Sequence, residues 1–278
     1  MDPRLTPFEA RPHGVLIRGV RGGEGPPALL LHGTAGSWRN FRPWLPALLP
    51  RLHLVLPDLP GFGTSPAPPL RPRLRTWARL LHALMAELGL APRVLGGLGL
   101  GASIALAYLQ VRQEALAATE RLVLYAPAYY PGAIRPAFRW GVRILGAPLV
   151  FPLVRHLFEH PKFQRWYLEH VVQGPDAPEE DVRLLREDFQ RASLPTLRGL
   201  ARDVVRADFR PLLAACQAAT LALVAEEDPF VYHTEVRRLE RLMPRVTVVV
   251  QPDLGHGWTA AAIEEQNAHL GRFLDQPP

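Results

Sequence analysis

Short apolar runs alternate with longer amphipathic stretches over most of this 278-residue chain. Buried strands of parallel sheets form short apolar runs, whereas surface helices repeat apolar residues every three to four positions. The alternation therefore predicts an α/β fold, with a mostly parallel central sheet and helices on both faces. The expected strands are Gly14–Val20 (an antiparallel edge strand), Ala28–Leu31, Leu52–Leu56, Arg93–Gly96, Leu122–Tyr125, Thr220–Val224 and Val246–Val250. The expected helices are Trp38–Leu49, Arg73–Leu88, Ala102–Gln113, His233–Leu242 and Ala260–Leu274.

One interval interrupts this alternation. Residues 128–208 contain no convincing strand and instead carry Pro-punctuated helical pieces that are rich in aromatic residues. Such a composition is too apolar for a linker, so the interval must pack against something. We therefore expect a core domain formed by residues 1–127 and 209–278, with residues 128–208 inserted as a helical lid.

Composition excludes several classes of protein. The basic residues are nearly all Arg and are scattered, so the sequence pI of about 10.1 does not indicate a nucleic-acid partner. The single cysteine, Cys216, cannot form an internal disulfide, and no apolar run reaches membrane-spanning length. The N-terminal residues lack the order of a signal peptide, so we expect a cytoplasmic protein. Abundant proline (30 residues) and few asparagines suit a heat-adapted chain.

The glycine-rich stretch Gly97–Leu–Gly–Leu–Gly–Ala102 permits two interpretations. It fits the G-x-G-x-x-G/A pattern of dinucleotide-binding turns. That pattern requires an acidic residue at the end of the next strand, but "RLVLYAP" has none there. The alternative is a sharp strand-to-helix turn that displays a catalytic residue. We prefer this second interpretation, which requires no cofactor and no metal.

Four further segments bear on this choice. "LLLHGTAGSW" (29–38) and "HLVLPDLPGFGTS" (53–65) resemble the oxyanion segment and the following strand-loop of α/β-hydrolase-fold enzymes. "LALVAEEDPFV" (221–231) and "VVVQPDLGHGW" (248–258) resemble the segments that carry their acid and their histidine. All four occur in the order of that family, around an interval where the family has its lid. The chain is therefore similar to lid-bearing α/β hydrolases.

The resemblance has one departure. The elbow of this family reads G-x-S-x-G, and its strained turn exposes the serine nucleophile. Here Gly99 occupies the serine position, whereas the flanking Gly97 and Gly101 are present. A glycine elbow is also similar to that of the N-myc downstream-regulated proteins, a branch of the fold regarded as non-hydrolytic.

The remaining site residues follow from the resemblance. It implies that Asp228 is the acid, that His256 is the base, and that the backbone amides of Thr34 and Leu100 are oxyanion donors. No other nucleophile is expected to replace the missing one. The other possible nucleophiles are expected to have capping, loop or packing roles, and these are Ser37, Ser65, Ser103, Ser193 and Cys216. His32 and Asp58 are likewise expected to have structural roles.

Two main functions remain open, with a small lipophilic ester or carbonyl compound as the ligand. In the first, His256 activates a water molecule near Gly99 for slow hydrolysis. In the second, the pocket binds its ligand without catalysis, as a carrier, sensor or scaffold. Nucleotide-dependent oxidoreduction ranks last, and Gly99 could also be an introduced substitution in an ordinary serine hydrolase. Arg135, Arg139 and Arg143 share a helix face, which we expect to be solvated rather than docked on a membrane.

Overall fold

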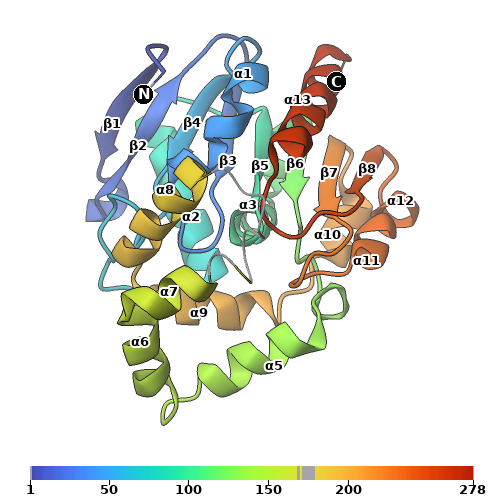
Figure 1. The fold of residues 1–278 in the computed structure, drawn as a ribbon. Coiled ribbons are helices and arrows are strands. Elements are labelled where there is room, and N and C mark those ends of the chain that lie inside the picture. The colour runs from blue at the N-terminus through green and yellow to red at the C-terminus, as the bar shows by residue number, and fades with distance from the viewer. Residues whose placement is uncertain (1, 168–169, 171–178, 278) are drawn as a thin grey trace.

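The computed structural model describes residues 2–167, 170 and 179–277. Eight strands form one sheet in the order β1-β2-β4-β3-β5-β6-β7-β8 (Figure 1). β1 and β2 are antiparallel to their neighbours, and the other strands are parallel. This confirms the predicted fold class. The strands are β1 (Leu5–Ala10), β2 (Ile17–Gly22), β3 (Pro27–Leu31), β4 (His53–Pro57), β5 (Val94–Leu98), β6 (Arg121–Tyr125), β7 (Ala219–Ala225) and β8 (Val246–Gln251).

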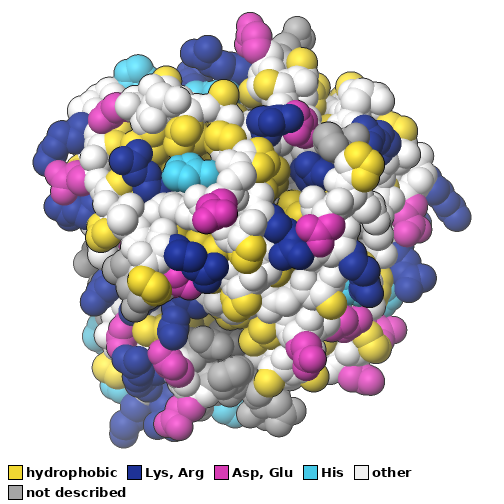
Figure 2. Space-filling model, turned by 90° about the horizontal axis from the view of Figure 1, so that it is seen from above, with side chains coloured by type: hydrophobic (Ala, Val, Ile, Leu, Met, Phe, Trp, Pro, Cys, Tyr) yellow, Lys and Arg dark blue, Asp and Glu magenta, His cyan; other side chains and the backbone are white. Residues whose placement is uncertain are grey.

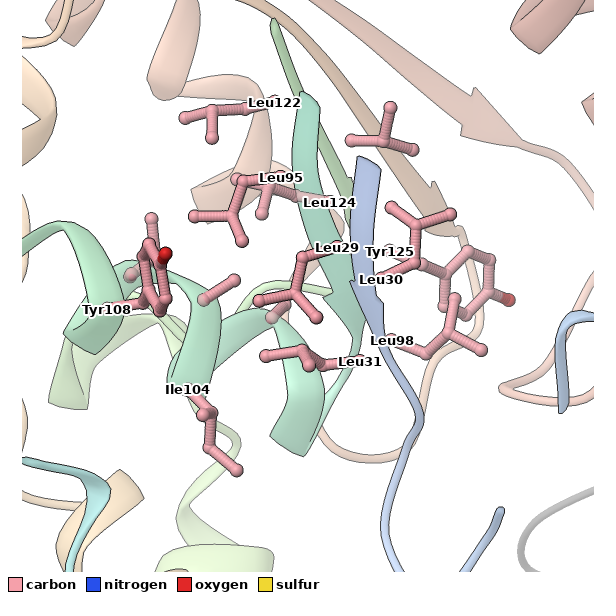
Figure 3. Packing of buried hydrophobic residues seen from close by; sticks show 14 of the residues in the cluster. Leu29, Leu30, Leu31, Leu95, Leu98, Ile104, Tyr108, Leu122, Leu124 and Tyr125 are labelled. Carbon is pink, nitrogen blue, oxygen red and sulfur yellow. The ribbon is translucent and has the colours of Figure 1, made fainter. Parts of the chain in front are cut away.

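The central strands are apolar throughout because both of their faces are covered. All five residues of β5 and of β6 are buried. Figure 3 shows the alternation that results: Leu29 and Leu31 of β3 point to the same side as Ile104, whereas Leu30 points away with Tyr125. Each strand thus contributes side chains to two cores, as expected for a sheet between two helical layers.

Two groups of helices cover the sheet (Figure 1). On one face lie α2 (Leu74–Glu87) and α3 (Leu100–Val111), and on the other lie α1 (Leu45–Leu48) and α13 (Ala260–Asp275). On the second face, the Trp44 indole donates to Gln266 of α13 at 2.7 Å. The shorter elements of the core are η1 (Pro12–Gly14), η2 (Trp38–Trp44), α4 (Gln113–Ala118), η3 (Pro131–Ala133), α10 (Arg210–Ala215), α11 (His233–Arg237) and α12 (Leu239–Leu242).

The segment between β6 and β7 is helical in its described part. It crosses the end of the molecule opposite both termini, beside the carboxyl ends of the parallel strands (Figure 1). Among the described residues of 128–208, the only β pairing is an isolated bridge from Ile134 to Val231. Residues 168–169 and 171–178 of the expected lid lie outside the described residues. The helices are α5 (Pro136–Leu145), α6 (Phe151–Glu159), α7 (Pro161–Tyr167), α8 (Glu179–Arg191) and α9 (Leu194–Val204).

The structure corrects some element boundaries. The predicted helix Trp38–Leu49 is a 3₁₀ segment followed by a single α-helical turn, and Pro43 lies inside the 3₁₀ segment. Proline lacks an N–H group and clashes with the preceding turn, which explains the break. The predicted edge strand Gly14–Val20 is β2, which lies one position inside the edge because β1 pairs with it.

Charge is not segregated on the end of the molecule that carries both termini. Figure 2 shows this face, and basic and acidic side chains are interspersed across it. The excess of arginine therefore forms no basic stripe there. In the described part of the chain, no helix is both long enough and apolar enough to cross a membrane.

Candidate active site

The turn between β5 and α3 has an unusual backbone conformation. Gly99 adopts φ 50° and ψ −104°, a region that side-chain-bearing residues rarely occupy. Its N–H donates to the Tyr125 carbonyl at 2.9 Å, and its carbonyl accepts from Ser103 N–H at 3.2 Å. The turn is thus held by hydrogen bonds on both sides. It projects position 99 away from the sheet at the carboxyl end of β5.

The flanking glycines allow this turn to pack closely. A Cβ atom on Gly101 would lie 2.0 Å from the Leu31 carbonyl oxygen, and one on Gly97 would lie 2.4 Å from the Gly101 carbonyl carbon. Both distances are far below van der Waals contact, so neither position accepts a side chain. These glycines serve the close packing of α3 against β3 and β5.

Position 99 itself is open. A Cβ atom there would meet only the His256 ring, with both Cε1 and Nε2 at 3.9 Å. These are ordinary van der Waals distances. A side chain at this position would therefore face the imidazole without a clash, although its backbone would be strained.

His256 and Asp228 form a hydrogen-bonded pair. Asp228 follows β7 and His256 follows β8, and His256 Nδ1 lies 2.6 Å from Asp228 Oδ2. The other carboxylate oxygen, Oδ1, accepts from the amides of Phe230 (2.8 Å) and Val231 (2.9 Å). An ionised carboxylate can only accept, so Nδ1 carries the proton in this pair. Nε2, on the other side of the ring, is then the basic nitrogen, and it faces Gly99.

The carboxyl group of Asp228 is fully buried. Burial raises its pKa, but the charge of His256 and the hydrogen bonds from His256, Val231 and Phe230 outweigh that effect. The pKa of Asp228 is therefore held below its usual value. Asp228 accordingly remains ionised at neutral pH despite its burial.

Aromatic side chains fix the His256 ring. Phe230 contacts it edge to face with ring centroids 4.7 Å apart, and Tyr125 does so at 5.9 Å. The Tyr125 hydroxyl also donates to the His256 carbonyl at 3.1 Å. Burial raises the pKa of Tyr125, so its hydroxyl remains a donor. Tyr125 was not among the residues singled out from the sequence.

The two expected oxyanion donors lie beside this pair on the wall of one cavity. Leu100 is the first residue of α3, where helix amides have no intrahelical partner. Thr34 follows β3 and makes no hydrogen bond to any other residue that the structure describes. Both amides are therefore available to a ligand oxygen.

The cavity has a volume of about 550 Å³ and a mainly apolar lining. Its floor comes from the core and includes Gly99, Leu100, Tyr125, His256 and Trp258. Its roof comes from the helices between β6 and β7. The apolar side chains of that roof include Phe138, Val142, Phe151, Val154, Phe158, Leu185 and Phe189. A cavity of this size and lining suits a small ligand with an apolar portion.

His32 and Asp58, which were also considered from the sequence, each make hydrogen bonds that hold a loop. The buried His32 donates from Nδ1 to the Gly33 carbonyl and accepts at Nε2 from Leu59 N–H, both at 2.9 Å. Burial lowers the pKa of His32, so the ring remains neutral. Asp58 accepts from the Trp38 amide at 2.9 Å and from both the amide and the hydroxyl of Thr64 at 2.7 Å. Both residues hold loops.

None of the remaining serines, nor Cys216, faces His256 with a free side chain. Ser37 and Ser193 cap helices, and the Ser65 hydroxyl accepts from the Arg18 amide. The buried Ser103 donates to the Ala128 carbonyl at 3.3 Å. Cys216 is fully buried, and burial raises the pKa of its thiol. The described residues contain no group of three or more His, Cys, Asp and Glu side chains that could hold a metal ion.

One charged cluster at the cavity was not anticipated from the sequence. Asp188 of α8 is buried and accepts from the Ser37 hydroxyl at 2.6 Å. It also pairs with Arg39, whose guanidinium contacts Glu187 at 2.9 Å. Asp188 and Ser37 are about 150 positions apart in the sequence, so no local pattern signals their contact. This cluster ties α8 to the loop that follows β3.

The fold and site together define a class. An elbow after β5 and a histidine after β8 line one cavity, and the acid after β7 bonds that histidine, as in α/β-hydrolase-fold proteins. The chain belongs to the alpha/beta hydrolase family, because the sequence profile of that family matches residues 28–268.

Relatives and solved structures agree with this assignment. The chain is 26% identical to Lipase 3 of Moraxella sp. (strain TA144) over 257 residues, which cover 90% of this chain and 78% of the relative. It is 25% identical to Lipase 1 of Psychrobacter immobilis over 244 residues, covering 87% and 74%. An esterase from Exiguobacterium antarcticum has a similar fold, with a TM-score of 0.82, 20% identity, and coverage of 97% of this chain and 99% of that chain.

Proposed function

We propose that this protein binds an ester or related carbonyl compound with an apolar portion and hydrolyses it slowly by general-base activation of water. One observation carries the proposal. His256 Nε2 faces the space above Gly99 and would lie 3.9 Å from a Cβ atom there, while Nδ1 is held by Asp228. The relatives that are named lipases support an ester as the substrate class.

The chemistry follows from the positions of these groups. A water molecule above Gly99 attacks the carbonyl carbon while its proton passes to His256 Nε2. The negative charge that develops on the carbonyl oxygen is stabilised by the Thr34 and Leu100 amides, and Asp228 stabilises the imidazolium. The tetrahedral intermediate then collapses, and the leaving alcohol takes the proton from His256. General-base catalysis contributes roughly 10²–10⁴-fold, and an oxyanion donor roughly 10²–10³-fold.

We propose residues 128–208 as a lid domain on a core of residues 1–127 and 209–278. The support is that α5, α6, α8 and α9 supply the cavity roof, whereas the catalytic candidates all come from the core. Arg198 and Arg202 of α9 both donate to the Gly146 carbonyl at 2.7 Å, which links α9 to the C-terminal end of α5.

Steady-state hydrolysis of p-nitrophenyl esters tests the catalytic proposal. We expect slow turnover by the wild type without an initial burst, because no acyl-enzyme forms. His256→Ala should reduce the rate to that of the buffer. His233→Ala is the matched control, since His233 is a half-buried histidine whose Nδ1 bonds the Glu226 carbonyl outside the cavity. Equal rates for wild type and His256→Ala would contradict catalysis.

The second candidate function is ligand binding without turnover. It is favoured by the combination of a 550 Å³ apolar cavity with a glycine at the nucleophile position. Displacement of a fluorescent fatty-acid probe by non-hydrolysable ketone analogues distinguishes the two candidates. If the protein only binds its ligand, the wild type and His256→Ala should bind the analogue with equal affinity.

A further inference from the structure

The exposed large hydrophobic side chains of this protein are concentrated on α5, α6 and α7. Among the described residues, Leu70 is the one member outside that segment. The most exposed are Leu149 at 95%, Leu153 at 70%, Ile144 at 57% and Trp140 at 54%. Leu145, Leu157 and Trp166 complete this set, which we call the outer apolar surface. Isolated exposed leucines need no explanation, but a concentration of this kind marks an interaction site.

Helix geometry places members of the outer apolar surface on a shared face within each helix. Trp140 and Ile144 are four residues apart on α5, Leu153 and Leu157 are four residues apart on α6, and Leu149 lies in the connection between the two helices. Residues four apart lie on one helix face. Figure 1 shows α5, α6 and their connection at the extreme end of the molecule, away from both termini. The surface is thus presented outward and is not turned toward the core.

Basic residues accompany this surface, and acidic residues are nearly lacking. Residues 136–167 contain five Arg or Lys residues and a single Glu. The Arg143 guanidinium lies over the exposed Trp140 ring at 5.2 Å, and neither Arg143 nor the exposed Lys162 makes an ion pair with any residue that the structure describes. Exposed Trp and Leu side chains beside unpaired basic groups are the combination that binds the headgroup region of anionic membranes.

We propose that the outer apolar surface docks on an anionic lipid surface. The alternative occupant is a second copy of the chain, but a symmetric dimer would bring the same basic residues together, at a cost in repulsion. An anionic bilayer instead complements them. This proposal departs from the sequence-based expectation of a solvated basic face. Arg135 and Arg139 are half-buried and donate to the carbonyls of Asp228 (2.6 Å) and Pro131 (2.9 Å), whereas Arg143 is exposed.

Docking would place the cavity next to the lipid. Phe138 and Val142 of α5 and Val154 of α6 line the cavity, whereas Ile144 and Leu153 of the same two helices belong to the outer apolar surface. The helices that roof the cavity would therefore contact the bilayer directly. An apolar ligand could then pass from lipid to cavity without crossing bulk water, which is unfavourable for apolar molecules.

Vesicle flotation with the full chain tests the proposal independently of any hydrolysis. The probes are phosphatidylcholine vesicles with and without one quarter phosphatidylglycerol. We expect binding to the anionic vesicles that weakens with added salt. The double variant Leu149→Gln/Leu153→Gln should bind at least tenfold more weakly. Arg143→Gln should lose about fivefold on anionic vesicles alone, since one basic residue contributes about 1 kcal/mol near such a surface.

Leu70→Gln is the matched control, because Leu70 is 40% exposed but lies outside the outer apolar surface. Its binding should equal that of the wild type, and thermal unfolding should show that all variants are folded. Equal binding by the wild type and the double variant, or no binding by the wild type, would overturn the proposal. Light scattering without lipid adds a further outcome. A wild-type dimer that the double variant abolishes would assign the surface to a second copy.

Discussion

At the residue scale, the site depends on the carboxylate of Asp228, which is buried and remains ionised. Asp228 is fully enclosed, yet three hydrogen-bond donors surround it, and one of them is the His256 ring. Burying a carboxylate is unfavourable unless such partners compensate. The same contacts fix which imidazole nitrogen carries the proton. One side chain therefore determines both the stability of the site and the basicity of His256 Nε2.

The lowered pKa of Asp228 predicts a pH dependence of stability. A carboxyl group whose pKa is lower in the folded state stabilises the fold above its unfolded pKa, near 3.9, and loses that contribution as the pH falls through the folded value. Asp228→Asn removes the titrating group. The urea unfolding free energy of the wild type should exceed that of the variant at pH 7, by roughly 1–3 kcal/mol.

The difference between the two proteins should shrink as the pH is lowered below about 4. Surface carboxylates titrate equally in both proteins, so the comparison isolates Asp228. A difference that stays constant from pH 7 to pH 3 would show that the Asp228 carboxylate contributes no pH-dependent stability.

At the scale of elements, α8 depends on a buried ion pair for its position. Asp188 bonds Ser37 and Arg39 of the core, and breaking one partner of a buried pair typically costs about 3–5 kcal/mol. We expect Asp188→Leu to increase hydrogen exchange across α8 more than across the core strands, since the contact holds this helix rather than the sheet. Arg183→Gln is the control, because Arg183 forms only an exposed pair with Glu187. It should change exchange little.

The elements also show which features a sequence pattern can predict. The six parallel strands are found within one or two residues of their predicted limits, because buried parallel strands leave continuous apolar runs. β1 was missed because its burial pattern combines buried and exposed residues around a proline, Pro7. The Arg39–Asp188 contact joins residues about 150 positions apart and leaves no periodic signal. The apolar exposure of α6 likewise depends on packing, which local sequence does not encode.

At the scale of the whole molecule, the sheet assembles the site from distant segments. Thr34, Gly99, Asp228 and His256 follow four different strands whose carboxyl ends meet at one edge. The family resemblance anticipated this convergence from motif order, and the cavity lining brings three of these residues together while His256 bonds the fourth. The sequence predicted a helical lid but not the shape of the cavity roof, which depends on how α5–α9 pack on the core.

In the proposed site, only a hydroxyl group is missing from an otherwise formed hydrolase site. Gly99→Ser tests this claim most directly, with Gly99→Ala as the matched control. Both variants share the backbone strain of φ 50°, of order 1–3 kcal/mol, but only serine supplies an oxygen one bond beyond the Cβ position that lies 3.9 Å from His256 Nε2. The measurement is covalent labelling by a fluorophosphonate probe. We expect rapid labelling of Gly99→Ser and none of Gly99→Ala or the wild type. A folded Gly99→Ser protein that labels no faster than Gly99→Ala would show that the site lacks more than a hydroxyl group.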